Sequence, residues 1–131
     1  MGVWENLKTR NVDGVGSLVS VVVQDKGNGE VLMLAYANRE ALEKTLETGL
    51  AHFFSTSRGR LWLKGEESGN TQKVSEVLVD CDGDAVVYRV EQTGGACHEG
   101  YRTCFHRKVT KSGLAVVGER LFNPSEVYRK K

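Results

Sequence analysis

The chain has 131 residues with a formal net charge of +1, and 40% of its residues are hydrophobic. This length fits one domain with a hydrophobic core, so we expect a single domain over residues 1–131. The near-neutral charge gives no electrostatic reason to expect a nucleic acid or an anionic membrane as partner. No apolar run approaches the roughly 20 residues of a membrane span.

The three cysteines favour a reducing compartment. Three cysteines cannot all pair within one chain, and the first residues do not resemble a signal peptide. We therefore expect a cytoplasmic protein, in which cysteines serve more often as metal ligands or nucleophiles than as disulfides.

The first part of the chain predicts a β-hairpin. Residues 18–24 are rich in valine and read as a strand, and residues 30–36 read as a second strand. Residues 25–29, Asp-Lys-Gly-Asn-Gly, have the composition of a tight turn between them.

One helix follows the hairpin, over residues 39–48. Asn38 is a good N-cap, and Gly49 supplies a C-terminal stop. Leu42 and Leu46 stand one turn apart, which predicts that both lie on the buried side.

The rest of the chain predicts mainly strands, and the whole reads as a mainly β (α+β) fold with one clear helix. The expected strands are residues 51–55, 61–64, 73–82, 85–92 and 114–117, with a final core strand at 104–109. Residues 110–131 form a charged C-terminal tail, and we expect Lys130 and Lys131 to be solvated.

A polar loop at residues 65–71 is rich in turn-forming residues. Its polar groups could cradle a phosphate together with nearby side chains; the candidates are Arg58, Lys64, Ser68, Gly69, Asn70 and Thr71. The alternative is a solvated connection, since loops are usually polar.

The strongest signal is an acidic cluster after the apolar run at residues 74–79. In a strand, every second residue lies ~6.6 Å further along the same face. Asp80, Asp82 and Asp84 would then share one face, with Cys81 on the other. Three carboxylates on one face repel one another unless a cation joins them, and oxygen ligands suit a hard ion such as Mg²⁺.

Cysteine ligands suit a softer ion such as Zn²⁺, with Cys97 and Cys104 as candidate partners of Cys81. Because no C-x-x-C pair is present, buried cysteines that act as small apolar residues are an alternative. For the acidic cluster, a solvated hairpin turn at Asp82-Gly83 is the alternative. An EF-hand is excluded, because Ala85 stands where that loop needs glycine and both flanks read as strands.

Among the three histidines, His98 directly follows a candidate zinc ligand. A zinc ion with three protein ligands keeps a fourth position for water, and His98 could accept the proton of that water. A surface loop histidine is the alternative. His52 reads as structural, and the pattern assigns no role to His106.

Several motifs, in one order, resemble a known family. They are LAYANREAL at residues 34–42, LWLKGEESGN at 61–70, DCDGD at 80–84, ACHEG at 96–100 and Cys104-Phe105. Over about residues 21–107 the chain closely resembles the phosphoribosyl-AMP cyclohydrolases of histidine biosynthesis.

This resemblance implies hydrolytic opening of the adenine ring of 1-(5-phosphoribosyl)-AMP between N1 and C6, by zinc-activated water. It implies that Mg²⁺ is bound by the three aspartates Asp80, Asp82 and Asp84, and Zn²⁺ by Cys81, Cys97 and Cys104. It also implies that the zinc ligands come from both subunits of an intertwined homodimer, and that His98 transfers the proton. The chain ends about 25 residues after the match, so it looks monofunctional.

Some residues depart from the family pattern. Thr56 stands where the family usually has arginine, so one phosphate contact could be missing or supplied elsewhere. Ala37 and Glu99 replace the usual Met and the frequent Thr, and no departure removes a metal ligand. A non-catalytic zinc-stabilised binding module remains an alternative, and so does a zinc deaminase, although the H-x-E and P-C-x-x-C signature is missing.

Overall fold

The computed structural model describes residues 2–127, so the predicted solvation of Lys130 and Lys131 concerns residues outside the described part. The strands are β1 (Arg10–Val12), β2 (Val15–Asp25), β3 (Val31–Ala37), β4 (His52–Ser55), β5 (Arg60–Leu63), β6 (Gln72–Val79), β7 (Ala85–Gln92), β8 (Arg107–Thr110) and β9 (Gly113–Val116). The helices are α1 (Arg39–Thr48), a 3-10 turn η1 (Trp4–Asn6) and a short α2 (Pro124–Val127). The fold is mainly β with one long helix, as the sequence predicts.

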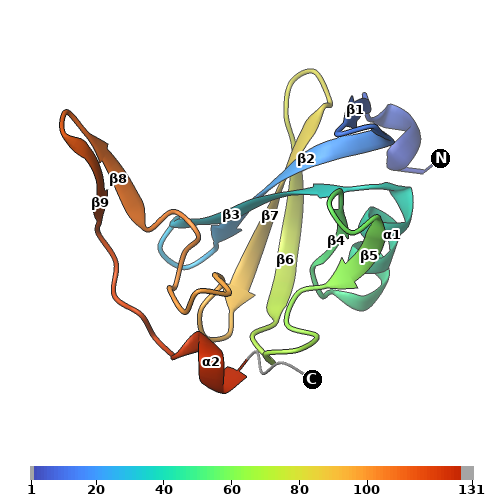
Figure 1. Ribbon diagram of the computed structural model, residues 1–131. Coiled ribbons are helices and arrows are strands. Elements are labelled where there is room, and N and C mark those ends of the chain that lie inside the picture. The colour runs from blue at the N-terminus through green and yellow to red at the C-terminus, as the bar shows by residue number, and fades with distance from the viewer. Residues whose placement is uncertain (1, 128–131) are drawn as a thin grey trace.

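The central strand is β2, which pairs with three other strands (Figure 1). It is antiparallel to β1 and β3 and parallel to β7, and β7 is antiparallel to β6. The β4–β5 pair lies beside α1, and the β8–β9 hairpin projects away from the sheet. None of the helices in residues 2–127 is long and apolar enough to cross a membrane.

The core lies on one face of the sheet, where strand alternation puts its branched side chains. Val19, Val21 and Val23 of β2 have no exposed surface. Tyr88 of β7 lies on the same face, and its ring packs 5.6 Å from that of Phe53 in β4. Burial of such side chains contributes about 1.5–3 kcal/mol each, so this face holds the layers together.

The helix begins and ends where the sequence predicts. The Oδ1 atom of Asn38 accepts a hydrogen bond of 2.9 Å from the Ala41 amide, which otherwise has no partner within the helix. Gly49 ends the helix with φ of 76°, a left-handed conformation that favours glycine.

The expectation that Leu46 is buried is wrong, because its exposed fraction is 51%. Leu42 is buried as expected, and the position below it on the buried face is Thr45. The Thr45 hydroxyl donates to the carbonyl of Ala41 (2.8 Å) and accepts from the His52 amide (2.9 Å). Because these hydrogen bonds satisfy its hydroxyl group, Thr45 can be buried at little cost. The buried face of α1 therefore includes Thr45 and leaves Leu46 exposed.

The second face of the sheet carries an apolar row of four side chains in register. Leu34 pairs with Val22, Val22 with Val87, and Val87 with Leu78. Leu34 and Leu78 are 54% and 48% exposed. We call Leu34, Val22, Val87 and Leu78 the apolar row.

Several predicted strands have different bounds in the structure. The strand expected at 73–82 ends at Val79, and residues 80–84 form a turn. The core strand expected at 104–109 is wrong: β8 begins at Arg107, and all four of its residues are exposed. The Cys104 amide donates to the Leu32 carbonyl (2.7 Å), which fixes this segment to β3 without a strand ladder. The strand expected at 114–117 is present as β9, one residue earlier.

Candidate metal centre and substrate cavity

The acidic cluster lies in the turn between β6 and β7. The Asp80 amide donates to the Ala85 carbonyl (3.0 Å), and the Gly83 amide donates to the Asp80 carbonyl (3.2 Å). The Asp80 side chain caps the turn, because its Oδ1 atom accepts from the amides of Asp84 (3.1 Å) and Ala85 (3.3 Å). Gly83 has φ of 77°, and a Cβ there would lie 3.1 Å from the Asn6 carbonyl oxygen. The left-handed backbone conformation and the close packing against Asn6 thus both favour glycine at this position.

This turn brings the three carboxylates together, with one oxygen from each of Asp80, Asp82 and Asp84 within 4.8 Å of the others. Hydrogen bonds with Asp82 and Asp80, burial and repulsion by their charges raise the pKa of Asp84. Slight burial raises the pKa of Asp80, but the amide donors of the turn and its carboxyl neighbours outweigh this and lower it. Such crowding of oxygen donors fits a hard divalent cation such as Mg²⁺. Arg10 already forms an ion pair with Asp84 in the single chain.

The backbone conformation that brings the three carboxylates together differs from the prediction. We expected the carboxylates to share the face of a strand, but the strand stops before Asp80. The turn that was the alternative is therefore present. It gathers the three carboxylates, and Asp80 and Asp82 remain exposed to solvent.

The other two cysteines lie on a compact loop after β7. The Ala96 amide donates to the Arg102 carbonyl (2.9 Å), and the Cys97 amide donates to the Tyr101 carbonyl (3.1 Å). The Gly100 amide donates back to the Cys97 carbonyl (3.0 Å). These bonds fold residues 96–102 onto themselves, so Cys97 is held near Cys104.

A clamp fixes this loop to the β2–β3 hairpin. The Arg102 guanidinium bonds to Glu30 (2.7 Å) and also pairs with Asp25. The Thr103 hydroxyl donates to the Val31 carbonyl (2.7 Å). The predicted hairpin turn therefore also positions the cysteine loop.

Cys97 and Cys104 lie close enough for the Cys97 thiol to raise the pKa of the Cys104 thiol. Cys97 is 4% exposed, and its Sγ atom accepts from the Glu99 amide at 3.4 Å. Burial raises the pKa of the Cys104 thiol to about 11, with the Cys97 thiol adding to the effect. A metal ion must displace these thiol protons, and paired thiols with an amide donor suit Zn²⁺.

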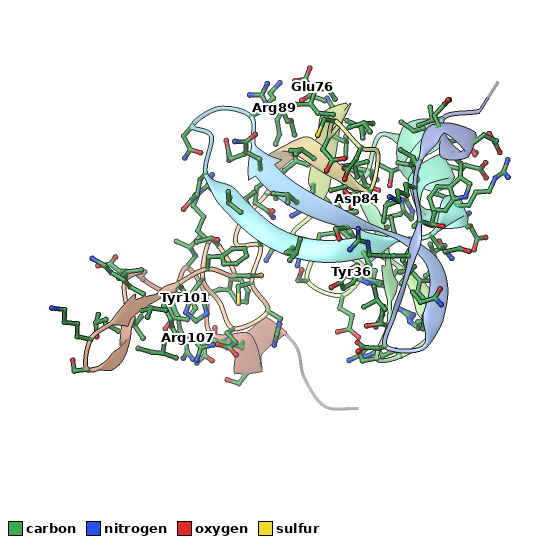
Figure 2. The ribbon with its side chains drawn as sticks, turned by 90° about the horizontal axis from the view of Figure 1, so that it is seen from above. Tyr36, Glu76, Asp84, Arg89, Tyr101 and Arg107 are labelled. Atoms are coloured by element: carbon green, nitrogen blue, oxygen red, sulfur yellow. The ribbon has the colours of Figure 1, made fainter. Side chains whose placement is uncertain are left out.

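Cys81 lies away from the other two cysteines. It is exposed in the β6–β7 turn, whereas Cys97 follows the far end of β7. β7 has 8 residues, so its two ends are roughly 25 Å apart at ~3.4 Å per residue. Figure 1 shows the β6–β7 turn beside β1, at the other end of the sheet from the loop that precedes β8. Figure 2 likewise separates Asp84 of this turn from Tyr101 of the cysteine loop. One chain therefore does not bring all three cysteines together.

A cavity of about 660 Å³ opens beside the cysteine loop. It brings together His98 and three of the predicted substrate contacts, Arg58, Lys64 and Ser68. Lys64 is 7% exposed, and its Nζ atom donates to the Ala96 carbonyl next to Cys97. Burial lowers the pKa of Lys64, while the nearby thiols of the cysteine loop act in the opposite direction.

The other predicted loop residues, Gly69, Asn70 and Thr71, do not line this cavity. The Gly69 amide donates to the Gly65 carbonyl (2.8 Å), and the Thr71 carbonyl accepts from the Thr93 amide (3.0 Å). In this chain their contacts close the loop and join it to the end of β7. Thr56, the departure from the family pattern, contacts Asp13 (3.4 Å) and is likewise not part of the lining.

Sequence reasoning missed several residues of the cavity wall. Arg60 and Trp62 alternate on one face of β5, and this period-two signal was available in the sequence. Pro124 and Ser125 come from α2, and nothing local indicates that the chain returns there. His106, which received no role, lies beside Cys97 and Glu99.

Comparison with known proteins agrees with the motifs. The family model described as Phosphoribosyl-AMP cyclohydrolase matches residues 33–106. The chain is 59% identical over 120 residues to the phosphoribosyl-AMP cyclohydrolase of Methanothermobacter thermautotrophicus, covering 90% of this chain and 86% of the relative. It is 60% identical over 115 residues to that of Methanothrix thermoacetophila, covering 88% and 93%. For Desulfotalea psychrophila the identity is 55% over 123 residues, covering 93% and 94%. The chain therefore belongs to the phosphoribosyl-AMP cyclohydrolase family, whose members are hydrolases acting on a cyclic amidine.

Proposed function

We propose that the chain opens the adenine ring of 1-(5-phosphoribosyl)-AMP by hydrolysis of the bond between N1 and C6. Family membership supports the reaction class. The observation that carries the proposal is the cavity that joins His98 to cationic and hydroxyl side chains next to the cysteine loop. A site for this substrate needs phosphate binders and a proton acceptor within reach of one another.

The substrate carries two phosphate groups, so cations should dominate its recognition. Arg58 and Arg60 line the cavity from β5 and the turn before it. The Arg60 guanidinium is bonded to Glu66 (2.8 Å), whereas no ion pair engages Arg58 within the described residues. We assign Arg58 to a phosphate, with Lys64 and Ser68 deeper in the same wall. Gly69, Asn70 and Thr71 then act by shaping this wall unless a second subunit brings the substrate to them.

Two metal ions fit the donor sets. The carboxylates of Asp80, Asp82 and Asp84 would hold Mg²⁺, and the thiolates of Cys97 and Cys104 would hold Zn²⁺ with a third thiolate from Cys81. Zinc bound in this way supplies the Lewis acidity that makes water nucleophilic near neutral pH.

His98 is the proposed proton acceptor. Its backbone is fixed because the amide of the preceding Cys97 is hydrogen-bonded across the loop, while its side chain is exposed at the cavity. An imidazole in this position can accept a proton from water and return it to the departing N1 atom. The aromatic wall at Trp62 would stack with or shield the purine.

A homodimer would bring Cys81 to the cysteine loop of the second subunit. The apolar row leaves Leu34 and Leu78 exposed on the open face, and Leu78 is close in sequence to Cys81. The β8–β9 hairpin projects from the sheet with Val109 81% exposed and Leu114 62% exposed. Both surfaces are costly in water and suit burial against a second copy.

The proposal is tested by the ultraviolet absorbance of phosphoribosyl-AMP mixed with the purified protein and Mg²⁺. We expect a spectral change that a zinc chelator abolishes and added zinc restores. If folded protein that contains zinc produces no change, the chain is not this enzyme and a zinc-stabilised binding module becomes the better reading. Release of ammonia would instead indicate a deaminase.

A further inference from the structure

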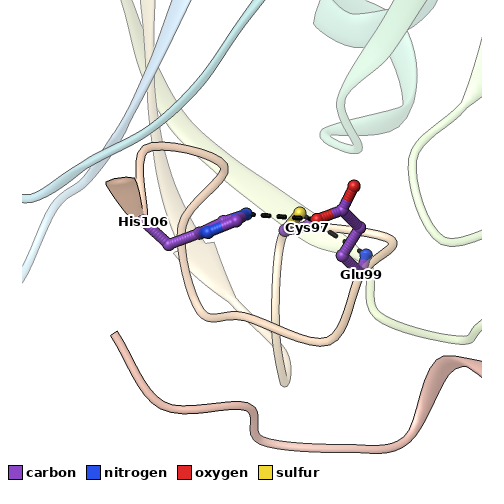
Figure 3. A group of neighbouring side chains, drawn as sticks. All are labelled: Cys97, Glu99 and His106. Atoms are coloured by element: carbon purple, nitrogen blue, oxygen red, sulfur yellow. Dashed lines mark hydrogen bonds and ion pairs between the residues drawn. The ribbon is translucent and has the colours of Figure 1, made fainter. Parts of the chain in front are cut away.

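Three different donor atoms of one chain lie close together where the cysteine loop meets the segment before β8. The Sγ atom of Cys97, a carboxylate oxygen of Glu99 and a ring nitrogen of His106 all lie within 4.8 Å of one another. Figure 3 shows the imidazole and the carboxylate approaching the sulfur from two sides. The cluster contains neither Cys81 nor the acidic turn, so it does not depend on the far end of the sheet.

His106 is held rigidly in this cluster. Its side chain is 8% exposed, and its ring stacks on Tyr101 at 3.7 Å with an interplanar angle of 12°. Its carbonyl accepts from the Val117 amide (2.8 Å), which fixes the backbone as well. Its Nδ1 atom is buried without a hydrogen-bond partner among the described residues. A buried ring nitrogen without a hydrogen-bond partner is costly and calls for an explanation of its own.

The partner of the other nitrogen is Glu99, but the separation is long for a hydrogen bond. The Nε2 atom of His106 lies 3.5 Å from the Glu99 carboxylate, whereas a good N–H···O bond is about 2.9 Å. Two nitrogen or oxygen ligands bound at about 2.1 Å to a tetrahedral ion lie roughly 3.4 Å apart. The pair is therefore already spaced as two ligands of one ion.

The third donor is also prepared for a metal. The Glu99 amide donates to the Cys97 sulfur at 3.4 Å, which favours a thiolate. A thiolate, an imidazole and a carboxylate together suit a borderline ion such as Zn²⁺ or Co²⁺, and they disfavour Mg²⁺.

We propose that Cys97, Glu99 and His106 form a divalent-metal site within a single chain. The site deepens the proposed zinc dependence, because it shares Cys97 with the three-cysteine centre but needs no residue of a second subunit. One ion can pass between the two ligand sets when Glu99 and His106 are exchanged for Cys104 and Cys81. A chain can thus hold its metal before a second subunit supplies Cys81.

The test is a titration of the full-length Cys81→Ser protein with Co²⁺, followed by absorbance. We expect one Co²⁺ per chain, with a thiolate-to-cobalt charge-transfer band and the intense visible bands of a tetrahedral site. His106→Phe keeps the stacking on Tyr101 and should weaken cobalt binding at least about tenfold. Glu99→Gln, at an exposed side chain, should weaken it in the same direction. His98→Asn is the matched control and should leave the affinity unchanged.

Two results would overturn the inference. One is that folded Cys81→Ser protein shows no thiolate–cobalt band. The other is that both His106→Phe and Glu99→Gln bind cobalt as tightly as their parent, since Cys97 and Cys104 then hold the ion without them. Neither result depends on turnover, so a failure here is distinguishable from a failure of the cyclohydrolase proposal in the wild-type absorbance assay.

Discussion

Single residues at this candidate site differ in their exposure and in their contacts. Lys64 is buried with its Nζ atom bonded to the Ala96 carbonyl, so its charge is committed to the cysteine loop. His98 follows Cys97 directly but is exposed at the cavity. The proposed function gives two neighbouring residues different roles, because Cys97 would hold a metal and His98 would accept a proton.

The first prediction concerns His98. In the His98→Ala protein, turnover should fall by about 10²–10⁴-fold, the usual range for loss of a general acid or base. Bound zinc, measured by atomic emission, should stay near one ion per subunit. A parallel loss of zinc and turnover would mean that His98 is a metal ligand.

The second prediction separates the two arginines of the cavity. Arg58→Gln should raise KM about 10–100-fold with little change in kcat, because a hydrogen bond to a charged phosphate contributes about 1.5–3 kcal/mol. Arg60→Gln is the control: its guanidinium is already bonded to Glu66, so its KM should change less. Steady-state kinetics on both proteins measure this, and equal effects would contradict the assignment of Arg58 to a phosphate.

At the scale of elements, a turn and a hairpin position the two candidate ligand groups. The β6–β7 turn is closed by its own backbone and by the Asp80 side chain. The cysteine loop, in contrast, is fixed from outside, since Arg102 reaches across to Asp25 and Glu30 at the β2–β3 turn. A substitution that disrupts the β2–β3 turn should therefore also disturb the position of the cysteine loop.

The third prediction tests this clamp through its pH dependence. Burial raises the pKa of Asp25, but the amides of Gly27 and Asn28 and the charge of Arg102 outweigh it, so its pKa is lowered from 3.8. The stabilisation is thus present above pH 3.8 and is lost as the pH falls below it. Asp25→Asn should cost about 1 kcal/mol at pH 7, and its difference from wild type should shrink below pH 4.

Urea unfolding at several pH values measures this difference. Glu47→Gln, an exposed substitution on α1, is the control and should leave the pH profile unchanged. A constant gap between Asp25→Asn and wild type down to the lowest pH would show that the charge of Asp25 contributes nothing.

At the scale of the whole molecule, the sheet is covered on one face and open on the other. The covered face carries Val19, Val21 and Val23 of β2, and the open face carries the apolar row. Cys81 and Cys97 lie at opposite ends of β7. A closed assembly of two copies would cover the apolar row of each copy. It would also bring Cys81 of one copy to Cys97 of the other.

The fourth prediction follows from that assembly. Cys81→Ser and Cys97→Ser proteins should each be inactive. When they are unfolded together and refolded as a mixture, half of the dimers combine one of each, and each of these has one complete site of two. Activity should return to about a quarter of wild type. If mixing restores nothing, the three cysteines do not come from two subunits.

What the sequence alone determines here is local chemistry. The hairpin at residues 18–36, the Asn38 cap and the Gly49 stop follow from backbone preferences that act over a few residues, and all three are present in the structure. The ordered motifs around Asp80 and Cys97 also identify the family, because a catalytic site requires particular donors at particular spacings.

Only the tertiary structure decided how these pieces meet. It placed Thr45 on the buried face where Leu46 was expected, because the threonine hydroxyl found partners in Ala41 and β4. It ended β6 before Asp80, where a turn leads into β7, and it paired β8 with β9 in a separate two-stranded sheet outside the core. It separated Cys81 from Cys97 and placed His106 beside Glu99. Such contacts depend on loop closure and packing over the whole chain, which no short stretch of sequence encodes.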